Sequence, residues 1–324
     1  MRGIRNTWNN NNVAQNFKKT GFFVDCCTGY SHRAGICKQR QMADEQNLQV
    51  YLEQVIGQGK ARNYKNLDEL NRVSAWIKEQ MRLLGVPCHY QNFTANQQIY
   101  RNVVCSLNVG RADRVIVGAH YDVFGDQDGA DDNASGVAGV IETARILAEQ
   151  KSKLPNNVDF VFYSLEEPPF SKTEQMGSYV HAKSVQSQKD KIKGVYILEM
   201  IGFFSEQPIQ SYPVGLKWIY PSHGNFIATV SNVSSRDLGA GYCTAMQQLD
   251  QLECQRLVAP SFANAFDFSD HLNYWGFDIP AVMITDTAFY RNGHYHTKAD
   301  RLATLNLTKM ANVIDGLVQH LLKP

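Results

Sequence analysis

A short apolar segment, Val115-Ile116-Val117-Gly118, leads directly into His120 and then into a polar run that ends at Gly136. That run includes Gly129-Ala130-Asp131-Asp132-Asn133-Ala134-Ser135-Gly136, and a helix is expected to begin at Ser135. A buried strand, a polar loop and a helix in this order are typical of one strand and helix unit in an α/β sheet.

The same alternation continues along the chain. Strands are expected at residues 88–93, 100–107, 115–118, 158–163, 195–198, 256–258 and 281–284. Helices are expected at residues 67–81, 135–149, 177–187, 269–275 and 307–322. This order predicts an α/β fold with a mostly parallel sheet covered by helices, and one domain over residues 46–324.

The composition excludes several classes of protein. The chain has 324 residues with a net charge of +1, from 32 Lys and Arg against 31 Asp and Glu. This balance gives no strong electrostatic field for nucleic acid or for an anionic membrane surface. A membrane-spanning helix needs about 20 apolar residues in a row, and the sequence has no such run. We therefore expect neither a nucleic-acid partner nor an integral membrane segment.

Residues 1–45 differ from the rest in having little periodicity, an Asn9-Asn10-Asn11-Asn12 run and many basic residues. We expect a disordered tail here, and a start of translation at Met42 is a second possibility. The apolar stretch Gly21-Phe22-Phe23-Val24 is too short for the core of a signal peptide. No signal peptide is therefore assigned, and the compartment stays open.

The seven cysteines contain no CxxC pair, so a thiolate zinc site is not expected. Cys243 and Cys254 are close enough in sequence to form a disulfide across a loop. Unpaired buried thiols at these two positions are an equal alternative.

Polar side chains follow three of the expected strands. His120 follows the strand at 115–118, Glu166 and Glu167 follow the strand at 158–163, and Glu199 follows the strand at 195–198. In open α/β sheets the chemistry gathers beyond the carboxyl ends of the strands. Carboxylates and imidazoles are ligand types that Zn²⁺ accepts, so a metal site is expected at this edge.

Adjacent acids allow a division of roles. Neighbouring side chains on an extended segment point in different directions, so one of Glu166 and Glu167 is free to bind metal while the other holds a water. A carboxylate also has two oxygens and is able to bridge two cations, a role that we assign to Asp131. The spacing of His294 and His296 does not decide which imidazole is the further ligand.

Taken together, these segments resemble the co-catalytic zinc aminopeptidases of clan MH, a group that includes bacterial leucyl aminopeptidases, glutamate carboxypeptidases and glutaminyl cyclases. The resemblance covers roughly residues 48–322. It rests on His120-Tyr121-Asp122, the run 129–136, Glu166-Glu167, Leu198-Glu199-Met200-Ile201-Gly202, Ser269-Asp270-His271 and Tyr295-His296-Thr297. It implies a three-layer α/β/α fold of the zinc-exopeptidase type with a mixed, mostly parallel central sheet.

The resemblance also implies roles for individual residues. Two zinc ions would be bridged by Asp131, with His120 and Glu199 completing one site and Glu167 and His296 the other. Glu166 would be the general base. Asp122 would orient His120, Asp270 would lie behind the ligands, and the Asp131-Asp132 peptide would be cis. The expected activity is hydrolysis of the N-terminal residue from peptides with a free N-terminus.

The chain departs from the family pattern at two places. Most relatives have aspartate where this chain has Glu199, so this ligand arm is one methylene longer. The segment 168–176 between Glu166-Glu167 and Gly177 is longer than usual. We expect this segment to change the rim of the substrate pocket.

Two other functions stay open at this level. A glutaminyl-peptide cyclotransferase would use one zinc on Asp131, Glu167 and His296, with Glu166, Glu199 and Asp270 moving protons. His120 argues against it, because a one-zinc enzyme does not need this ligand. A catalytically inactive binding protein is disfavoured because all five ligands and the base are present. The oligomeric state is not assigned.

Overall fold

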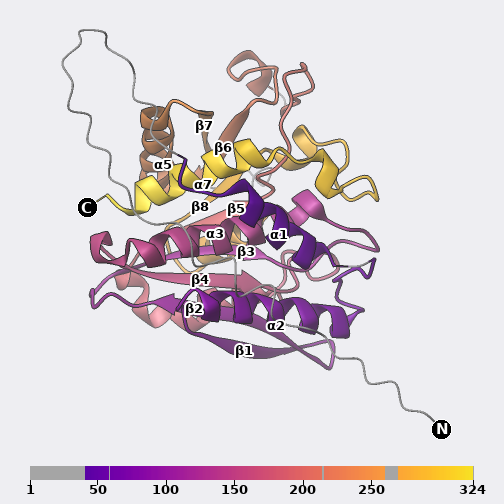
Figure 1. Ribbon diagram of the computed structural model, residues 1–324, viewed down its shortest axis with the longest axis vertical. Coiled ribbons are helices and arrows are strands. Elements are labelled where there is room, and N and C mark those ends of the chain that lie inside the picture. The colour runs from indigo at the N-terminus through magenta and orange to yellow at the C-terminus, as the bar shows by residue number, and fades with distance from the viewer. Residues whose placement is uncertain (1–40, 58, 214, 260–268, 324) are drawn as a thin grey trace. The chain divides into compact units, whose positions relative to one another are not determined.

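The computed structural model describes residues 41–57, 59–213, 215–259 and 269–323 (Figure 1). Eight strands form one sheet in the order β1-β2-β4-β3-β5-β8-β6-β7. The strands are β1 (Cys88–Ala95), β2 (Gln98–Leu107), β3 (Arg114–His120), β4 (Asn157–Tyr163), β5 (Ile192–Glu199), β6 (Phe226–Asn232), β7 (Glu253–Ala259) and β8 (Ala281–Thr285).

The sheet is mixed. The central strands β4, β3, β5 and β8 are parallel to one another, and β6 and β7 form a second parallel pair. The pairs β1 with β2, β2 with β4, and β6 with β8 are antiparallel. The central strands are buried along nearly their whole length, which explains why they read as continuous apolar runs in the sequence.

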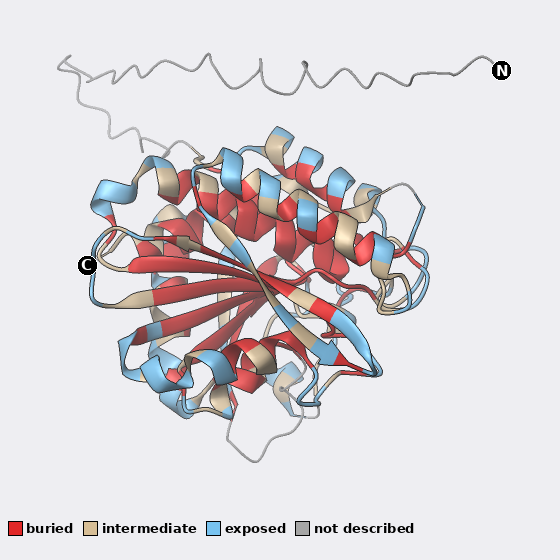
Figure 2. Ribbon diagram, turned by 90° about the horizontal axis from the view of Figure 1, so that it is seen from below, coloured by how far each residue is buried: buried red, intermediate tan, exposed pale blue. Residues whose placement is uncertain are grey.

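Helices cover both faces of the sheet (Figure 2). The helices α1, α2, α3, α5 and α7 lie on one face, and α4 and α6 lie on the other. Their bounds are α1 (Glu45–Ile56), α2 (Leu67–Leu83), α3 (Gly136–Glu149), α4 (Gly177–Val185), α5 (Arg236–Leu249), α6 (His271–Trp275) and α7 (Leu307–Leu321). The predicted three-layer α/β/α class with a mixed, mostly parallel sheet is confirmed.

Each predicted strand and helix has a counterpart in the structure, but α1, β6 and α5 were not predicted. Helix α5 contains Gly239 and Gly241, and glycine lowers helix propensity by about 1 kcal/mol relative to alanine. Tertiary packing explains both glycines, because a Cβ atom would lie 2.8 Å from the Thr229 hydroxyl at the first and 2.5 Å from the His320 ring at the second.

Most of the expected N-terminal tail, residues 1–40, lies outside the described residues, as do Cys26, Cys27 and Cys37. Residues 41–45 are part of the folded domain. The backbone N–H groups of Met42 and Ala43 donate to the buried carboxylate of Asp315. Asp44 caps α1 by accepting from the N–H of Gln46 at 2.8 Å. No helix among the described residues is long and apolar enough to cross a membrane.

Two disulfides join neighbouring elements. Cys88 and Cys105 are directly opposite each other on β1 and β2, and Cys243 of α5 is bonded to Cys254 of β7. The second bond decides between the two alternatives left open by the sequence. The first was not predicted, because it depends on the pairing register of two strands.

We predict that Gly118→Ala destabilises the domain by about 1–3 kcal/mol, the usual cost of overfilling a packed core. A Cβ atom at Gly118 would lie 2.6 Å from the ring of Tyr163, whose hydroxyl is held at 2.7 Å from that of Tyr274. Urea denaturation measures the change. Gly276→Ala is the control, because its Cβ would meet no atom closer than 3.4 Å. Equal unfolding midpoints for the two variants would contradict this packing argument.

Candidate metal centre

Three neighbouring parallel strands deliver the site residues to one edge of the sheet. His120 is the last residue of β3, and Glu199 is the last residue of β5. Glu166 and Glu167 follow the end of β4 after two intervening residues. The tertiary structure thus brings together the side chains that the sequence placed after separate strands.

Three overlapping groups of side chains among the described residues are able to hold a cation. His120, Asp132 and Glu199 form the first group, Asp132, Glu167 and His296 form the second, and His120, Glu166 and Glu167 form the third. The first two groups share Asp132. Asp132 lies between two imidazoles: its Oδ1 is 3.3 Å from Nε2 of His120, and its Oδ2 is 3.1 Å from Nε2 of His296. This carboxylate is therefore placed to face two cations at once.

The outer ligands complete the two groups. Glu199 Oε2 lies 3.4 Å from Nε2 of His120, and Glu167 Oε2 lies 3.2 Å from Nε2 of His296. Both carboxylates and His120 are buried, and His296 is partly exposed. His294 lies outside these groups and contacts the ring of Phe203 edge-on. Of the pair that spacing left open, His296 therefore lies beside the carboxylates of Asp132 and Glu167, and His294 does not.

The shared position differs from the prediction by one residue. The carboxylate of Asp131 points away from both groups, accepting from the N–H of Gly202 at 2.9 Å and from Nδ2 of Asn292 at 2.8 Å. Burial and the neighbouring carboxylate of Asp286 raise the pKa of Asp131 well above its usual range. Asp131 is therefore corrected from a bridging ligand to a buried acid behind the site.

The cis peptide bond also lies one residue further along the chain than predicted. It joins Asp132 to Asn133 instead of Asp131 to Asp132. The tandem acids belong to the short turn Ala130–Ser135, in which neighbouring side chains point in different directions. Composition alone did not show which of the two carboxylates faces the imidazoles.

Asp122 ties the ends of two strands together. Its Oδ1 is 3.5 Å from Nδ1 of His120, where the sequence placed an orienting carboxylate. The same carboxylate accepts from the N–H groups of Glu166 and Glu167, both at 3.2 Å. One side chain thus fixes the relative position of the β3 and β4 ends.

Several residues that the sequence did not single out support the two groups. Asp300 accepts from the N–H of Asp131 at 2.8 Å and from that of Asp132 at 3.1 Å. Asn133 donates to the carbonyl of Leu198 at 2.9 Å, and it accepts from the N–H of Met200 at 3.1 Å. No sequence signal marks these contacts, because they join segments more than 60 residues apart.

The longer arm of Glu199 has its own partner. Ser269 donates its hydroxyl proton to Glu199 Oε2 at 2.8 Å, and both side chains are buried. Asp270 is also fully buried, and burial raises its pKa to about 7. Asp270 belongs to none of the groups of three, and its place behind the ligands stays a prediction.

The electrostatics of the cluster favour a cation. Burial, followed by the charge on Asp132, raises the pKa of Glu167 to about 8, and burial raises that of Glu166 well above its usual range. Burial opposes the protonation of His120, yet the carboxylates led by Glu199 raise its pKa well above 6.5. Both ring nitrogens of His120 and Oε1 of Glu167 are buried without a hydrogen-bond partner. Oxygen and imidazole donors of this kind suit Zn²⁺.

A buried arginine holds the loop that carries Asp132. Arg62 is 1% exposed, and its guanidinium donates to the carbonyls of Tyr121 at 2.8 Å and Gly129 at 2.7 Å. It also donates to the carbonyl of Asp128. The planar fork of the arginine thus fixes the path from β3 to the turn at Ala130–Ser135.

An apolar pocket opens beside the site. It contains about 840 Å³ of empty space, open solvent included, and reaches Glu199 and Tyr295 at the metal groups. Tyr212, Phe226 and Met283 are among its apolar lining residues. The ring of Tyr295 stacks on that of His296 at 3.7 Å between centroids, so the pocket and the second group are in contact.

The mixed sheet, with helices on both faces and a metal-competent cluster at one edge, has the zinc-exopeptidase type of α/β/α fold that the sequence predicted. A solved glutaminyl cyclase of Porphyromonas gingivalis has this fold with a TM-score of 0.64 at 18% identity, over 87% of this chain and 99% of that chain. At this identity the similarity shows the fold alone.

The chain belongs to peptidase family M28, whose sequence model matches residues 102–320. It is 40% identical over 267 residues to "Uncharacterized protein YfbL" of Escherichia coli (strain K12), covering 79% of this chain and 81% of that protein. It is 26% identical over 226 residues to "Leucine aminopeptidase 1" of Ajellomyces capsulatus. That match covers 64% of this chain and 52% of the relative, about half of its length. Family membership classes the chain with the hydrolases that act on peptides.

We predict that Arg62→Lys destabilises the domain by about 2–3 kcal/mol, the value of hydrogen bonds to a buried charge. Lysine keeps the charge but is unable to reach three carbonyls with a planar fork. Arg82→Lys is the control, because the Arg82 and Glu79 pair is exposed, and such pairs contribute about 0–1 kcal/mol. Thermal and urea denaturation measure both. If Arg62→Lys loses no more stability than Arg82→Lys, the three hydrogen bonds of Arg62 do not stabilise the loop as argued.

Proposed function

We propose that the protein is a zinc-dependent aminopeptidase with two metal ions and Glu166 as general base. One observation carries this proposal: two metal-competent groups share the carboxylate of Asp132. A second, fully buried imidazole at His120 is needed only if the first group also holds an ion. The similarity to a leucine aminopeptidase supports the same activity.

Under this proposal His120, Asp132 and Glu199 hold one ion, and Asp132, Glu167 and His296 hold the other. The buried Nε2 of His120 and Oε1 of Glu167 fit this set, because a cation would satisfy atoms that have no hydrogen-bond partner. When bound, the ions supply Lewis acids that polarise the water and the scissile carbonyl. Zinc is proposed because oxygen and imidazole ligands suit it.

Glu166 is free to move a proton. Its Oε2 lies 3.9 Å from Nε2 of His120, and Glu166 belongs to neither of the two groups that share Asp132. Burial raises its pKa, so the carboxylate is a stronger base than an exposed glutamate. We propose that Glu166 accepts the proton of the attacking water and passes it to the leaving amine.

The surroundings of the site fit a peptide with a free N-terminus. Glu166, Glu167 and Glu199 would attract the terminal ammonium group, and this attraction would confine cleavage to the end of a chain. The apolar pocket beginning at Glu199 would take the first side chain, since its walls include Tyr212, Phe226 and Met283. We therefore propose a preference for large apolar N-terminal residues.

Cyclisation of an N-terminal glutamine is the second candidate, favoured by the solved structure of a glutaminyl cyclase with this fold. It would use one ion on Asp132, Glu167 and His296. The buried contacts of His120 with Glu199 and Asp132 support the two-ion alternative. Metal analysis separates the two: about two zinc ions per chain supports hydrolysis, and one supports cyclisation.

We predict that the protein cleaves leucyl- and phenylalanyl-nitroanilide, and that a chelator abolishes this activity. Glu166→Gln is expected to lower kcat by about 10²–10⁴, the usual contribution of a general base. Its zinc content should stay at the wild-type value, because the proposed ligands are the two groups that share Asp132, and Glu166 belongs to neither of them. Folded, zinc-loaded wild-type protein that is inert on a broad panel of aminoacyl-nitroanilides would exclude the aminopeptidase.

We further predict opposite outcomes at the two tandem acids. Asp132→Asn should lose zinc from both groups, because the amide has only one oxygen for two cations. Asp131→Asn should retain zinc, because its side chain contacts Gly202 and Asn292 instead of the imidazoles. Zinc per chain, measured by atomic spectroscopy after dialysis, tests both. Loss of zinc in Asp131→Asn with retention in Asp132→Asn would return the bridge to Asp131.

A further inference from the structure

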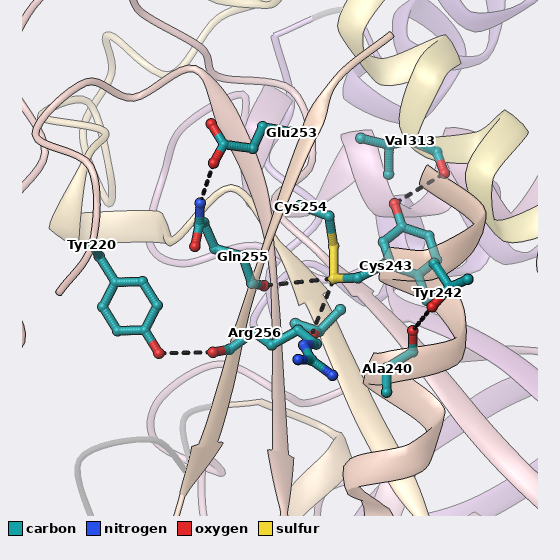
Figure 3. The surroundings of a disulfide bond; sticks show 11 residues. Tyr220, Ala240, Tyr242, Cys243, Glu253, Cys254, Gln255, Arg256 and Val313 are labelled. Atoms are coloured by element: carbon teal, nitrogen blue, oxygen red, sulfur yellow. Dashed lines mark hydrogen bonds between the residues drawn. A yellow bond between two sulfur atoms is a disulfide. The ribbon is translucent and has the colours of Figure 1, made fainter. Parts of the chain in front are cut away.

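The pocket beside Glu199 and the Cys243–Cys254 disulfide lie on opposite faces of the same strand. Gln255, Arg256 and Leu257 of β7 line the pocket, and because side chains alternate along a strand, Gln255 and Leu257 lie on the same face. Cys254, one position away, faces α5 and is bonded to Cys243 (Figure 3). The disulfide therefore supports from behind the strand that forms a pocket wall.

This wall is weakly held by the sheet itself. β7 is the last strand in the sheet order, and it pairs with β6 alone among the described strands. An edge strand has hydrogen bonds on one side only, so it opens more easily than a central strand. A wall made from such a strand needs a further attachment to keep its position.

Helix α5 supplies a firm attachment point. The buried hydroxyl of Tyr242, next to Cys243, donates to the carbonyl of Val313 in α7 at 3.2 Å. Met246 packs so closely on Gly316 of α7 that a Cβ there would lie 2.0 Å from its sulfur. Through the Cys243–Cys254 bond, β7 is therefore joined covalently to a helix that is packed into the core.

A residue from another segment that lines the pocket is hydrogen-bonded to β7. Tyr220, which also lines the pocket, donates its hydroxyl proton to the carbonyl of Arg256 at 2.7 Å (Figure 3). A shift of β7 would thus move both Gln255 and Leu257 and the segment that carries Tyr220. The positions of two pocket walls therefore depend on β7, which is attached to β6 by hydrogen bonds and to α5 by the disulfide.

We propose that the Cys243–Cys254 disulfide is a positioning element for substrate specificity. It holds β7 so that the pocket accepts a large apolar side chain of the substrate's first residue. This inference rests on the proposed aminopeptidase function, because only that function assigns the pocket to the first residue. Neither cysteine belongs to a metal-competent group of the described residues, so the effect of the bond falls on substrate affinity and leaves kcat and zinc content unchanged.

The chain contains its own matched control. The Cys88–Cys105 disulfide joins β1 and β2 at the opposite edge of the same sheet, and neither residue lines the pocket. Cys88→Ala/Cys105→Ala removes one disulfide from an edge, as Cys243→Ala/Cys254→Ala does. A general loss of stability would affect both double variants, whereas a pocket effect is expected in one.

The test compares both double variants with the wild type. In Cys243→Ala/Cys254→Ala we expect KM for leucyl- and phenylalanyl-nitroanilide to rise about tenfold, or about 1.4 kcal/mol of binding. KM for alanyl-nitroanilide should change much less, since alanine leaves the pocket largely unfilled. Amide hydrogen exchange of residues 253–259 should become faster in this variant and stay unchanged in the control.

A folded Cys243→Ala/Cys254→Ala variant with wild-type KM values would overturn the inference, and so would an equal KM rise in the control. If the wild type cleaves no aminoacyl substrate, the proposed function fails. The positioning role is overturned separately if amide hydrogen exchange of residues 253–259 is the same in Cys243→Ala/Cys254→Ala as in the wild type. If the variant does not fold, a phosphine reductant is applied to folded Cys88→Ala/Cys105→Ala, in which Cys243–Cys254 is the remaining disulfide of the described residues. The same rise in KM and exchange is then expected, and its absence refutes the inference.

Discussion

The carboxylate of Asp132 between the imidazoles of His120 and His296 is the contact on which the rest of the site depends. Several acids are buried around it, and burying carboxylates is costly unless opposite charge is near. The fold meets this requirement by directing imidazoles and further carboxylates to the same edge of the sheet. Cations would offset the charge of these buried carboxylates, so the proposed function depends on metal binding.

Support for Asp132 comes from distant parts of the chain. Asp300 accepts from its N–H, Arg62 holds the preceding loop by three carbonyls, and Asp122 joins the ends of β3 and β4. These contacts pre-organise the ligands before any ion binds, as a site with a defined geometry requires. Ser269 does the same for the longer side chain of Glu199.

The same fold occurs in proteins that catalyse different reactions, so the side chains at the site determine which reaction takes place. The solved glutaminyl cyclase and the leucine aminopeptidase relative are both similar to this chain. Under the proposed function, two features separate the two reactions: a buried His120 in contact with Glu199, and an apolar pocket that begins at that glutamate. The wall of this pocket is an edge strand attached by a disulfide, so specificity and metal binding depend on different parts of the fold.

The sequence by itself determined the α/β class and the positions of His120, Glu166, Glu167 and Glu199 after their strands. Apolar runs followed by polar residues are local patterns, and parallel strands bring their carboxyl ends together. Only the tertiary structure decided that Asp132 is shared instead of Asp131, because two adjacent acids are equivalent in composition and differ only in direction. It also revealed Arg62, Asp300, Ser269 and the Cys88–Cys105 bond, since these contacts depend on how distant segments meet and not on any local pattern.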